Sequence, residues 1–481
     1  MRLRPILYIL GAINLCIALA MVAPLIVSLL YHDGTTHAFL MAIIASGVVG
    51  TVLFLIFRGG KVDIGHREGF LIVTLAWLDI CLFGALPYLF SGLFSTFVNA
   101  YFESVSGFTT TGASVLTHIA DLPHGILFWR SMTQWLGGMG IILLSLAILP
   151  LLGVGGMQLY KAEASVVTAD KFVPRITEMA KILWLAYLIL SVVLLVALKL
   201  AGMNLFDSFV HTFATISTGG FSSQNISVEY YGSPLIESLL MIFMFLGATS
   251  FALHYRCYRE GFRVYLKNGE FGLYVFLVLV SSAIVIVNMW YSHYESFVLS
   301  IRHALFQVIS VITTTGYSSA DFVNWPPLSK SVLLLLMLLG GTAGSTTGAI
   351  KCIRILVLFK LGYREIVRLV HPHAVLPIKL GGRSIPNEVL SGVMGFTFIY
   401  LFLFALTSLL LAGMNLDIVT AISASAATIG NIGPGLGAVG PASNYSAIPF
   451  AGKWLLIINM LMGRLEIYTL VVLFTPAFWR G

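Results

Sequence analysis

Charged residues are scarce in this sequence. They make up 10% of its 481 residues, whereas hydrophobic residues make up 58%. Soluble domains usually carry about 25% charged residues, so the composition excludes an ordinary soluble protein and predicts an integral membrane protein. The formal net charge is +7. Because the basic residues are concentrated in a few connections, this charge indicates membrane topology rather than nucleic-acid binding.

Cysteines and enzyme motifs are also few. The cysteines are Cys16, Cys81, Cys257 and Cys352, and they form no C-x-x-C pair, so no disulfide framework or metal site is predicted. The sequence has no G-x-x-x-x-G-K-[ST] motif, and no connection is long enough for a folded soluble domain. We therefore expect no enzyme activity and no nucleotide or other cofactor bound by this chain.

Long apolar segments are abundant. A segment of about 20 apolar residues can span a bilayer as a helix. Ten segments qualify, at residues 5–30, 38–57, 70–91, 126–152, 181–201, 235–255, 271–291, 331–360, 390–413 and 454–475. The first is longer than the apolar region of a signal peptide, which favours a retained helix over a cleaved leader.

Lys and Arg gather in alternate connections between these segments. The basic connections carry Arg58, Lys61 and Arg67; Lys161, Lys171, Arg175 and Lys181; Arg256, Arg259, Arg263 and Lys267; and Lys360, Arg364, Arg368, Lys379 and Arg383. Residues 31–37 and 203–234 contain no Lys or Arg. The positive-inside rule therefore predicts that the basic loops and both termini are cytoplasmic.

Four of the outward connections share a pattern. Each holds an apolar stretch of about 10–15 residues, too short to span and typical of a re-entrant half-helix, followed by a Thr/Gly cluster. Aligned without gaps on one glycine, they read FSTFVNAYFESVSGFTTTG (94–112), AGMNLFDSFVHTFATISTG (201–219), VLSIRHALFQVISVITTTG (298–316) and AGMNLDIVTAISASAATIG (412–430).

This repetition predicts the fold class. We expect an all-α membrane protein with about ten transmembrane helices and four re-entrant half-helices, arranged as four parallel helix–pore-loop–helix repeats around a pseudo-fourfold axis. An extra helix pair at 1–60 precedes the repeats, which are expected at 61–160, 161–265, 266–375 and 376–481.

Non-helical backbone at membrane depth must be hydrogen-bonded or line a wet cavity. Four such loops around one axis predict an ion filter, because inward carbonyl oxygens can replace the hydration shell of a cation. The alternative is tight helix packing by small residues. The predicted potassium-binding residues are Thr110, Thr111, Gly112, Ser217, Thr218, Gly219, Thr314, Thr315, Gly316, Thr428, Ile429, Gly430 and Asn431.

The four clusters are not identical. In this alignment one glycine position is common to all, and the next residue differs, being Ala113, Gly220, Tyr317 or Asn431. We therefore expect fewer ion sites, and weaker discrimination against sodium or rubidium, than in a potassium channel with two glycines in each loop.

A second glycine-rich stretch interrupts the segment at 331–360. It predicts either a flexible loop that gates the pore or a tightly packed kink. The predicted gate residues are Gly340, Gly341, Thr342, Ala343, Gly344, Ser345, Thr346, Thr347 and Gly348.

Several other polar residues have predicted roles. Arg464, in the last apolar segment, is expected to be a barrier in the pore, an anchor for the carbonyls of the gate stretch, part of a structural ion pair, or a backbone cap. Lys351 and Arg354 are expected to extend toward the cytoplasm. Asp417 is expected to cap the fourth half-helix. The histidines, including His211, show no ligand spacing.

The chain resembles the Trk/Ktr/HKT superfamily of potassium transporters, most closely the bacterial TrkH/TrkG proteins. The resemblance extends over nearly the whole chain. It is carried by TTTGAS, STGGFS, TTTGYSS and TIGNIGPG, by QWLGGMG (134–140), GGTAGSTTGAIK (340–351) and GRLEIY (463–468), and by the helix pair before the first repeat. It implies potassium uptake across the bacterial inner membrane, a homodimer with one pore per protomer, and a cytoplasmic TrkA-like nucleotide-binding partner.

Two modes of transport stay open. One is a gated, passive, channel-like pore, and the other is a symporter that couples potassium to protons or sodium. Coupling calls for a buried acidic residue near the bilayer midplane, and the apolar segments offer mainly Asp79 and Glu466. This scarcity favours the passive pore.

Overall fold

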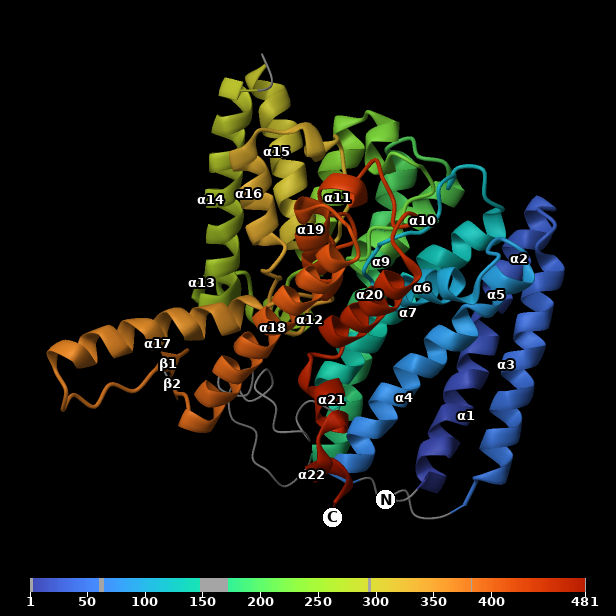
Figure 1. Ribbon diagram of the computed structural model, residues 1–481, viewed down its shortest axis with the longest axis horizontal. Coiled ribbons are helices and arrows are strands. Elements are labelled where there is room, and N and C mark those ends of the chain that lie inside the picture. The colour runs from blue at the N-terminus through green and yellow to red at the C-terminus, as the bar shows by residue number, and fades with distance from the viewer. Residues whose placement is uncertain (1–2, 60–64, 148–171, 293–295, 382, 481) are drawn as a thin grey trace.

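The chain folds as a bundle of helices that surrounds four short half-helices (Figure 1). The computed structural model describes residues 3–59, 65–147, 172–292, 296–381 and 383–480. Lys61, Lys161 and Lys171, and the expected repeat boundaries at 61 and 160–161, lie outside these residues.

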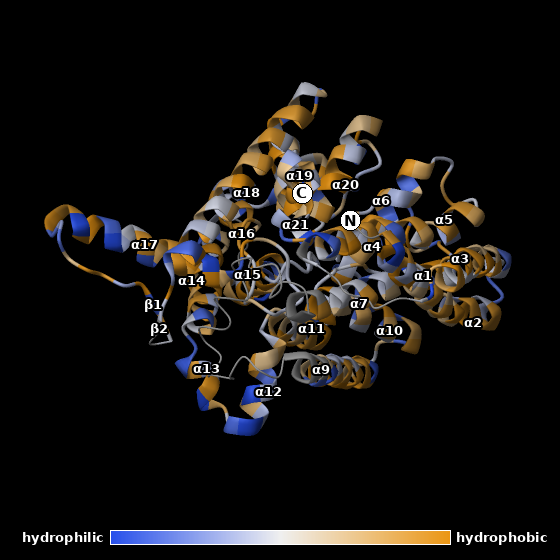
Figure 2. Cartoon of the chain, turned by 90° about the horizontal axis from the view of Figure 1, so that it is seen from below, coloured by the Kyte–Doolittle hydropathy of each residue, from blue (hydrophilic) through white to orange (hydrophobic). Residues whose placement is uncertain are grey.

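Long apolar helices form the outer part of the molecule. Six helical segments are sufficient alone to cross a membrane: Leu3–Tyr31, Thr36–Ile56, Arg67–Phe90, Glu178–Leu200, Gly269–Ser292 and Asn387–Gly413. Two further pairs qualify as broken spans, Pro234–Gly247 with Phe251–Glu260, bent by 93°, and Phe450–Arg464 with Tyr468–Phe474, bent by 112°. Hydrophobic residues dominate these helices. Hydrophilic residues gather where α12 (Phe251–Glu260) meets α13 (Arg263–Lys267) and along α17 (Cys352–Val370), as Figure 2 shows. The expected helical membrane fold is confirmed.

The N-terminal helices lie at one edge of the bundle (Figure 1). They are α1 (Leu3–Ala20), α2 (Val22–Tyr31) and α3 (Thr36–Ile56). Asp33, in the turn before α3, accepts hydrogen bonds from the Oγ atoms of Ser28 and Thr35 and, at 2.7 Å, from the backbone N–H of Gly125. These bonds hold the turn between α2 and α3 against the start of α7 (His124–Ala147).

The next helices follow the expected order in each quarter of the bundle. The first quarter contains α4 (His66–Gly84), α5 (Leu86–Phe90), α6 (Phe97–Phe108) and α7 (His124–Ala147). The second contains α9 (Phe172–Leu200), α10 (Leu205–Ile216), η1 (Ser227–Tyr231), α11 (Pro234–Gly247), α12 (Phe251–Glu260) and α13 (Arg263–Lys267).

The last two quarters have the same order. The third contains α14 (Gly269–Ser292), α15 (Phe297–Ile312), η2 (Phe322–Asn324), α16 (Pro327–Leu336) and α17 (Cys352–Val370), followed by the antiparallel pair β1 (Lys379–Leu380) and β2 (Arg383–Ser384). The fourth contains α18 (Asn387–Gly413), α19 (Ile418–Ile429), η3 (Gly437–Val439), α20 (Phe450–Arg464), α21 (Tyr468–Val471), η4 (Val472–Phe474) and α22 (Pro476–Trp479).

The four half-helices are α6, α10, α15 and α19. Each contacts the long helix before it and the inner helix after it, and three also contact the inner helix of the preceding quarter. Side chains start two of them: Asp417 Oδ2 accepts the backbone N–H of Thr420 at 3.0 Å, and Asn204 caps α10 in the same way. The predicted cap at Asp417 is therefore confirmed.

Candidate ion-conduction pathway

Four short loops with one backbone conformation follow the half-helices. We call them the ring loops, and they comprise residues 109–112, 217–220, 313–316 and 430–433. In each, the second residue has a positive φ between 51° and 53°, and the fourth is a glycine with φ between 74° and 97°. The third residue of each loop donates its N–H to a carbonyl oxygen five residues earlier, in the half-helix, at 2.8–2.9 Å. Their shared geometry shows that the four loops are structural equivalents.

The ring loops touch one another in cyclic order. A methyl group added to the glycine of one loop would clash with the carbonyl oxygen of the third residue in the next loop, for the pairs Gly112 and Gly219, Gly220 and Thr315, Gly316 and Ile432, and Gly433 and Thr111. Asn431 Nδ2 also donates to Thr111 Oγ1 at 3.0 Å, between residues 320 positions apart. The fourth loop therefore closes a ring on the first, and only glycine fits at each junction.

This geometry corrects the gapless sequence alignment in two loops. The equivalents of Gly112 and Gly316 are Gly220 and Gly433, not Gly219 and Gly430. Thr428 and Ile429 are the last residues of α19, and Gly430 caps it. Ser217 likewise caps α10. The alignment was one residue out of register in the second loop and three in the fourth, because it matched letters and not the hydrogen bond that ends each half-helix.

The second position of each ring loop is conformationally strained. Thr110, Thr218 and Thr314 have positive φ, which is a rare conformation for a β-branched residue. Asn431 has this position in the fourth loop, and asparagine tolerates it better. Such strain persists only where the surrounding structure imposes it, and it is concentrated at functional sites.

The half-helices direct their carboxyl ends at the ring. Each ends at the residue before its ring loop. The carboxyl end of a helix carries a partial negative charge of about half an electron, so four such ends favour a cation at the centre. The buried side chain of Gln134 supports the second loop, because its Nε2 donates to the carbonyl oxygen of Gly219 at 2.6 Å and its Oε1 accepts the N–H of Phe221 at 3.0 Å.

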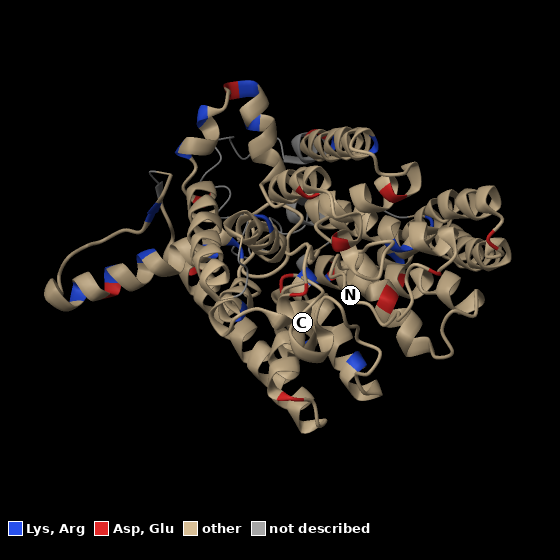
Figure 3. Cartoon of the chain, turned by 90° about the horizontal axis from the view of Figure 1, so that it is seen from above, with Lys and Arg blue, Asp and Glu red and all other residues tan. Residues whose placement is uncertain are grey.

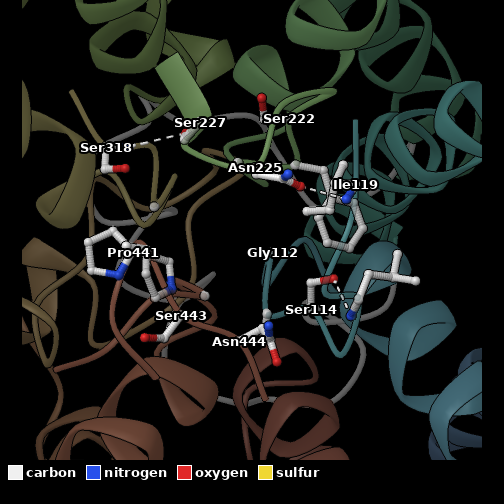
Figure 4. Close-up of a pocket in the computed structure, with 18 of the residues that line it drawn as sticks. Gly112, Ser114, Ile119, Ser222, Asn225, Ser227, Ser318, Pro441, Ser443 and Asn444 are labelled. Carbon is white, nitrogen blue, oxygen red and sulfur yellow. Dashed lines mark hydrogen bonds between the residues drawn. The ribbon is translucent and has the colours of Figure 1, made fainter. Parts of the chain in front are cut away.

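A cavity of about 120 Å³ lies directly against the ring glycines. Figure 4 shows that its wall comes from all four quarters, with Ser114, Asn225, Ser318 and Ser443 around the opening. Hydrogen bonds join adjacent quarters at this wall, including Asn225 Oδ1 with the N–H of Ile119 at 2.6 Å. The cavity is lined by backbone and small polar groups, which suits a partly hydrated ion.

The loop at 340–348 packs directly against the ring. Thr346 Oγ1 donates to the carbonyl oxygens of Ile216 and Gly247 at 3.2 and 3.1 Å, and accepts from Thr218 Oγ1 at 3.2 Å. The N–H of Gly348 donates to Thr314 Oγ1 at 2.9 Å. The predicted break between α16 and α17 is therefore present, and its loop contacts two ring threonines.

The 340–348 loop is held at both of its ends. Hydrogen bonds between Gly340 and Ile350, and between Ile350 and Leu338, close its neck at 2.9 and 3.2 Å. Glu270 Oε1, from α14, accepts the N–H groups of Ala343 at 2.7 Å and Ile353 at 3.1 Å. The glycine-rich stretch is thus an ordered loop in this conformation.

Arg464 lies against this loop and not in the middle of a helix. It is the last residue of α20, and it is 2% exposed. Its Nη1 donates to the carbonyl oxygen of Thr346 at 2.6 Å, and its Nη2 donates to that of Gly137 at 3.2 Å. Of the predicted alternatives, the arrangement matches the anchor for the loop carbonyls.

The prediction that Lys351 and Arg354 extend toward the cytoplasm is wrong. Both are buried, at 7% and 2% exposed. Lys351 Nζ donates to Thr347 Oγ1 at 2.8 Å, and Arg354 pairs with Glu466 while its guanidinium lies 3.9 Å from the ring centre of Phe396. The helix break after Arg464 brings Glu466 within reach, which a straight-helix reading could not foresee.

The other expected acidic site is separate from the ring. Asp79, on α4, accepts a hydrogen bond from Asn14 Nδ2 on α1 at 2.8 Å. No group of three or more His, Cys, Asp or Glu side chains that could hold a metal ion occurs among the described residues. The ring loops themselves offer a cation backbone carbonyl oxygens and threonine hydroxyl oxygens.

The fold and the ring loops define a membrane protein in which one chain surrounds a single axis with four re-entrant loops. A family model named TrkH and described as "Cation transport protein" matches residues 35–480. The chain belongs to this TrkH family of cation transport proteins, and the predicted resemblance is confirmed.

Known relatives match the chain from end to end. It is 43% identical to the Trk system potassium uptake protein TrkH of Escherichia coli (strain K12) over 484 residues, covering 100% of both chains. It is 34% identical to TrkG of the same strain, covering 100% of this chain and 99% of that protein. The crystal structure of the potassium transporter TrkH from Vibrio parahaemolyticus superposes with a TM-score of 0.92 at 40% identity, covering 100% of both chains.

Proposed function

We propose that this chain takes up potassium across the bacterial inner membrane through a gated, channel-like pore. The observation that carries the proposal is the closed ring of four equivalent loops, each preceded by the carboxyl end of a half-helix. The potassium-uptake names of relatives at 34–43% identity point to the ion.

The proposed filter is the backbone of the four ring loops. Its residues are Thr110, Thr111, Gly112, Thr218, Gly219, Gly220, Thr314, Thr315, Gly316, Asn431, Ile432 and Gly433. Carbonyl oxygens would replace the hydration shell of the ion. Potassium is then the transported ion, and neither a cofactor nor an enzymatic activity belongs to the proposal.

The proposed gate is the 340–348 loop with Arg464 as its anchor. Two hydrogen bonds to the ring support this assignment: Thr346 Oγ1 accepts from Thr218 Oγ1, and the N–H of Gly348 donates to Thr314 Oγ1. The loop must therefore move before an ion can pass beneath the ring. The Arg464 guanidinium adds a positive charge on the same path, which opposes cation passage while the loop is in place.

A passive pore is preferred over a symporter coupled to protons or sodium. Glu466 is paired with Arg354, and Asp79 lies between α1 and α4, away from the ring. Glu466 lines a small cavity beside the 340–348 loop, but its carboxylate is already engaged by Arg354, which favours a passive pore.

We also propose a homodimer with a cytoplasmic TrkA-like nucleotide-binding partner, with both termini cytoplasmic. Support for the dimer comes from α17, which leaves the bundle sideways (Figure 1) and has Phe359, Tyr363, Ile366 and Leu369 between 64% and 84% exposed. Lys and Arg gather on the α12–α13 connection and on α17 (Figure 3), which suits cytoplasmic contacts. The unit boundaries proposed are 1–60, 61–160, 161–265, 266–375 and 376–481.

The test is ion flux through the purified chain in liposomes with a potassium gradient and no proton or sodium gradient. The proposal predicts flux down the potassium gradient that Gly316→Ser alters. Flux that appears only after a proton or sodium gradient is added would instead identify a symporter.

A further inference from the structure

A buried polar side chain recurs behind three of the four ring loops. It stands seven residues before the strained second position, as Glu103 in α6, His211 in α10 and Gln307 in α15, and the fourth half-helix has Ala424 there. All three polar residues are 0% exposed. The repeat indicates that this position has a structural role. The gapless alignment matched Glu103 with Gln307 but displaced His211 by one residue.

Each of these side chains reaches the one to three residues that directly follow its own ring loop, which we call the outer end of that loop. Glu103 accepts hydrogen bonds from Ser114 Oγ at 3.0 and 3.1 Å and from the N–H of Val115 at 3.1 Å. The equivalent His211 Nε2 lies 3.2 Å from Ser222 Oγ. Gln307 Nε2 donates to the carbonyl oxygen of Tyr317 at 3.3 Å. In these three quarters, a side chain of the half-helix thus holds the segment that follows the ring glycine.

Glu103 also forms an ion pair. Arg130 Nε, from α7, lies 2.8 Å from Glu103 Oε1, and Arg130 is 1% exposed. The same guanidinium donates to the carbonyl oxygen of Ser222 and to Ser114 Oγ, both at 3.3 Å, and lies 4.0 Å from the ring centre of Phe221. One ion pair therefore fixes the outer ends of the first and second ring loops relative to each other.

We propose that Glu103 and Arg130 are positioning residues for ion selectivity. A ring of carbonyl oxygens discriminates potassium from sodium through the spacing and number of its oxygens. A buried ion pair is directional, and its best-attested use is to specify one geometry. The pair keeps the first and second loops from closing inward around a smaller ion. The inference rests on the proposed potassium filter.

The chain supplies a matched control pair. Glu237 of α11 and Arg302 of α15 form a two-pronged ion pair with both N–O distances at 2.7 Å, and Glu237 is 1% exposed. The hydrogen bonds of these two side chains within the described residues reach no ring loop. Loss of that pair weakens helix packing without moving the ring.

The experiment measures the reversal potential of the full chain in planar bilayers, with potassium on one side and sodium on the other. Glu103→Gln should raise the sodium-to-potassium permeability ratio about tenfold, a change of about 1.4 kcal/mol, because a neutral amide no longer forms the ion pair that holds Arg130 between the two loops. Arg130→Lys keeps the positive charge but loses the several N–H donors of the guanidinium, so it should raise the permeability ratio less. Glu237→Gln should lower thermal stability and leave the ratio unchanged.

The double variant Glu103→Gln/Arg130→Met guards against a single variant that fails to fold, because it leaves no unpaired buried charge. A folded double variant with a raised ratio supports the inference, and one with the ratio of the unaltered chain overturns it. An unaltered chain that conducts no potassium would overturn the proposed function itself, so the two failures are distinguishable.

Discussion

The ring of four loops and the layer beneath it differ in symmetry. The ring takes one equivalent loop from each quarter of the chain, and the four share φ values within a narrow range. The layer beneath it is asymmetric, because a single loop from the third quarter forms it. Arg464 of the fourth quarter donates a hydrogen bond to the carbonyl oxygen of Thr346 in this loop, and the N–H of Thr342 donates to the carbonyl oxygen of Ala248 in the second quarter. An ion site needs oxygens on every side, whereas one movable element is enough to block a path.

The largest predicted effect comes from a substitution in the symmetric ring. Gly220→Ala should reduce potassium flux in liposomes by at least about tenfold, because a strained backbone position costs about 1–3 kcal/mol. Gly220 has φ 74°, and an added methyl group would also strike the carbonyl oxygen of Thr315. Gly219→Ala is the matched variant, and a smaller loss of flux is expected there, because the atoms nearest to its added methyl group belong to the Gln134 side chain, which can shift, and not to backbone. Equal loss in both variants would refute the corrected register.

A smaller effect is expected from a substitution in the asymmetric layer beneath the ring. Arg464→Ala removes the hydrogen bond from the guanidinium to the carbonyl oxygen of Thr346 in the loop, and the one to the carbonyl oxygen of Gly137 in α7. Potassium flux through the chain alone should rise about tenfold, because hydrogen bonds to charged groups are worth about 1.5–3 kcal/mol each and one such loss favours release of the loop.

The control for Arg464 is Lys453→Ala in the same helix. Lys453 Nζ donates to Asn99 Oδ1 at 3.0 Å and to the carbonyl oxygen of Ser446 at 2.9 Å. Neither of these partners belongs to the 340–348 loop. Its flux should match that of the unaltered chain. Unchanged flux in Arg464→Ala would rule out both the barrier and the anchor roles.

The smallest effect concerns the N-terminal helix pair, which lies outside the ring. Burial raises the pKa of Asp33, but hydrogen bonds from Gly125, Ser28 and Thr35 outweigh it, and the net pKa is lowered from 3.8. A lowered pKa means that the carboxylate stabilises the fold above pH 3.8 and loses this contribution as the pH falls through the folded-state pKa.

Asp33→Asn should therefore lower the melting temperature by no more than a few degrees at neutral pH. The difference from the unaltered chain should shrink in acid, as measured by thermal unfolding in detergent. Potassium flux should not change. A melting difference that grows in acid would have the wrong sign for this explanation.

Much of the fold was predictable from composition and repetition. Apolar length located the spans, and four short apolar stretches before Thr/Gly clusters located the half-helices. Register within the loops was not predictable, because Asn431 replaces a threonine and the glycine of the fourth loop follows Ile432. The second loop offered two adjacent glycines, Gly219 and Gly220, and letters alone could not choose between them.

The surroundings of individual charged side chains could not be predicted from the sequence either. Lys351 and Arg354 follow a break whose depth depends on how the 340–348 loop folds back. Arg130 reaches the second ring loop only because α6, α7 and α10 are packed together. Partners far apart in the chain require the packed structure to identify them.

The closure of the ring by Asn431 and Thr111 has a consequence for how the protein is made. These residues are 320 positions apart. Because chains are synthesised from the N-terminus, three quarters of the molecule can enter the bilayer before the last loop is available. A nascent or truncated chain therefore has an open-sided ring, and it cannot form a complete ion pathway until nearly the whole polypeptide has left the ribosome.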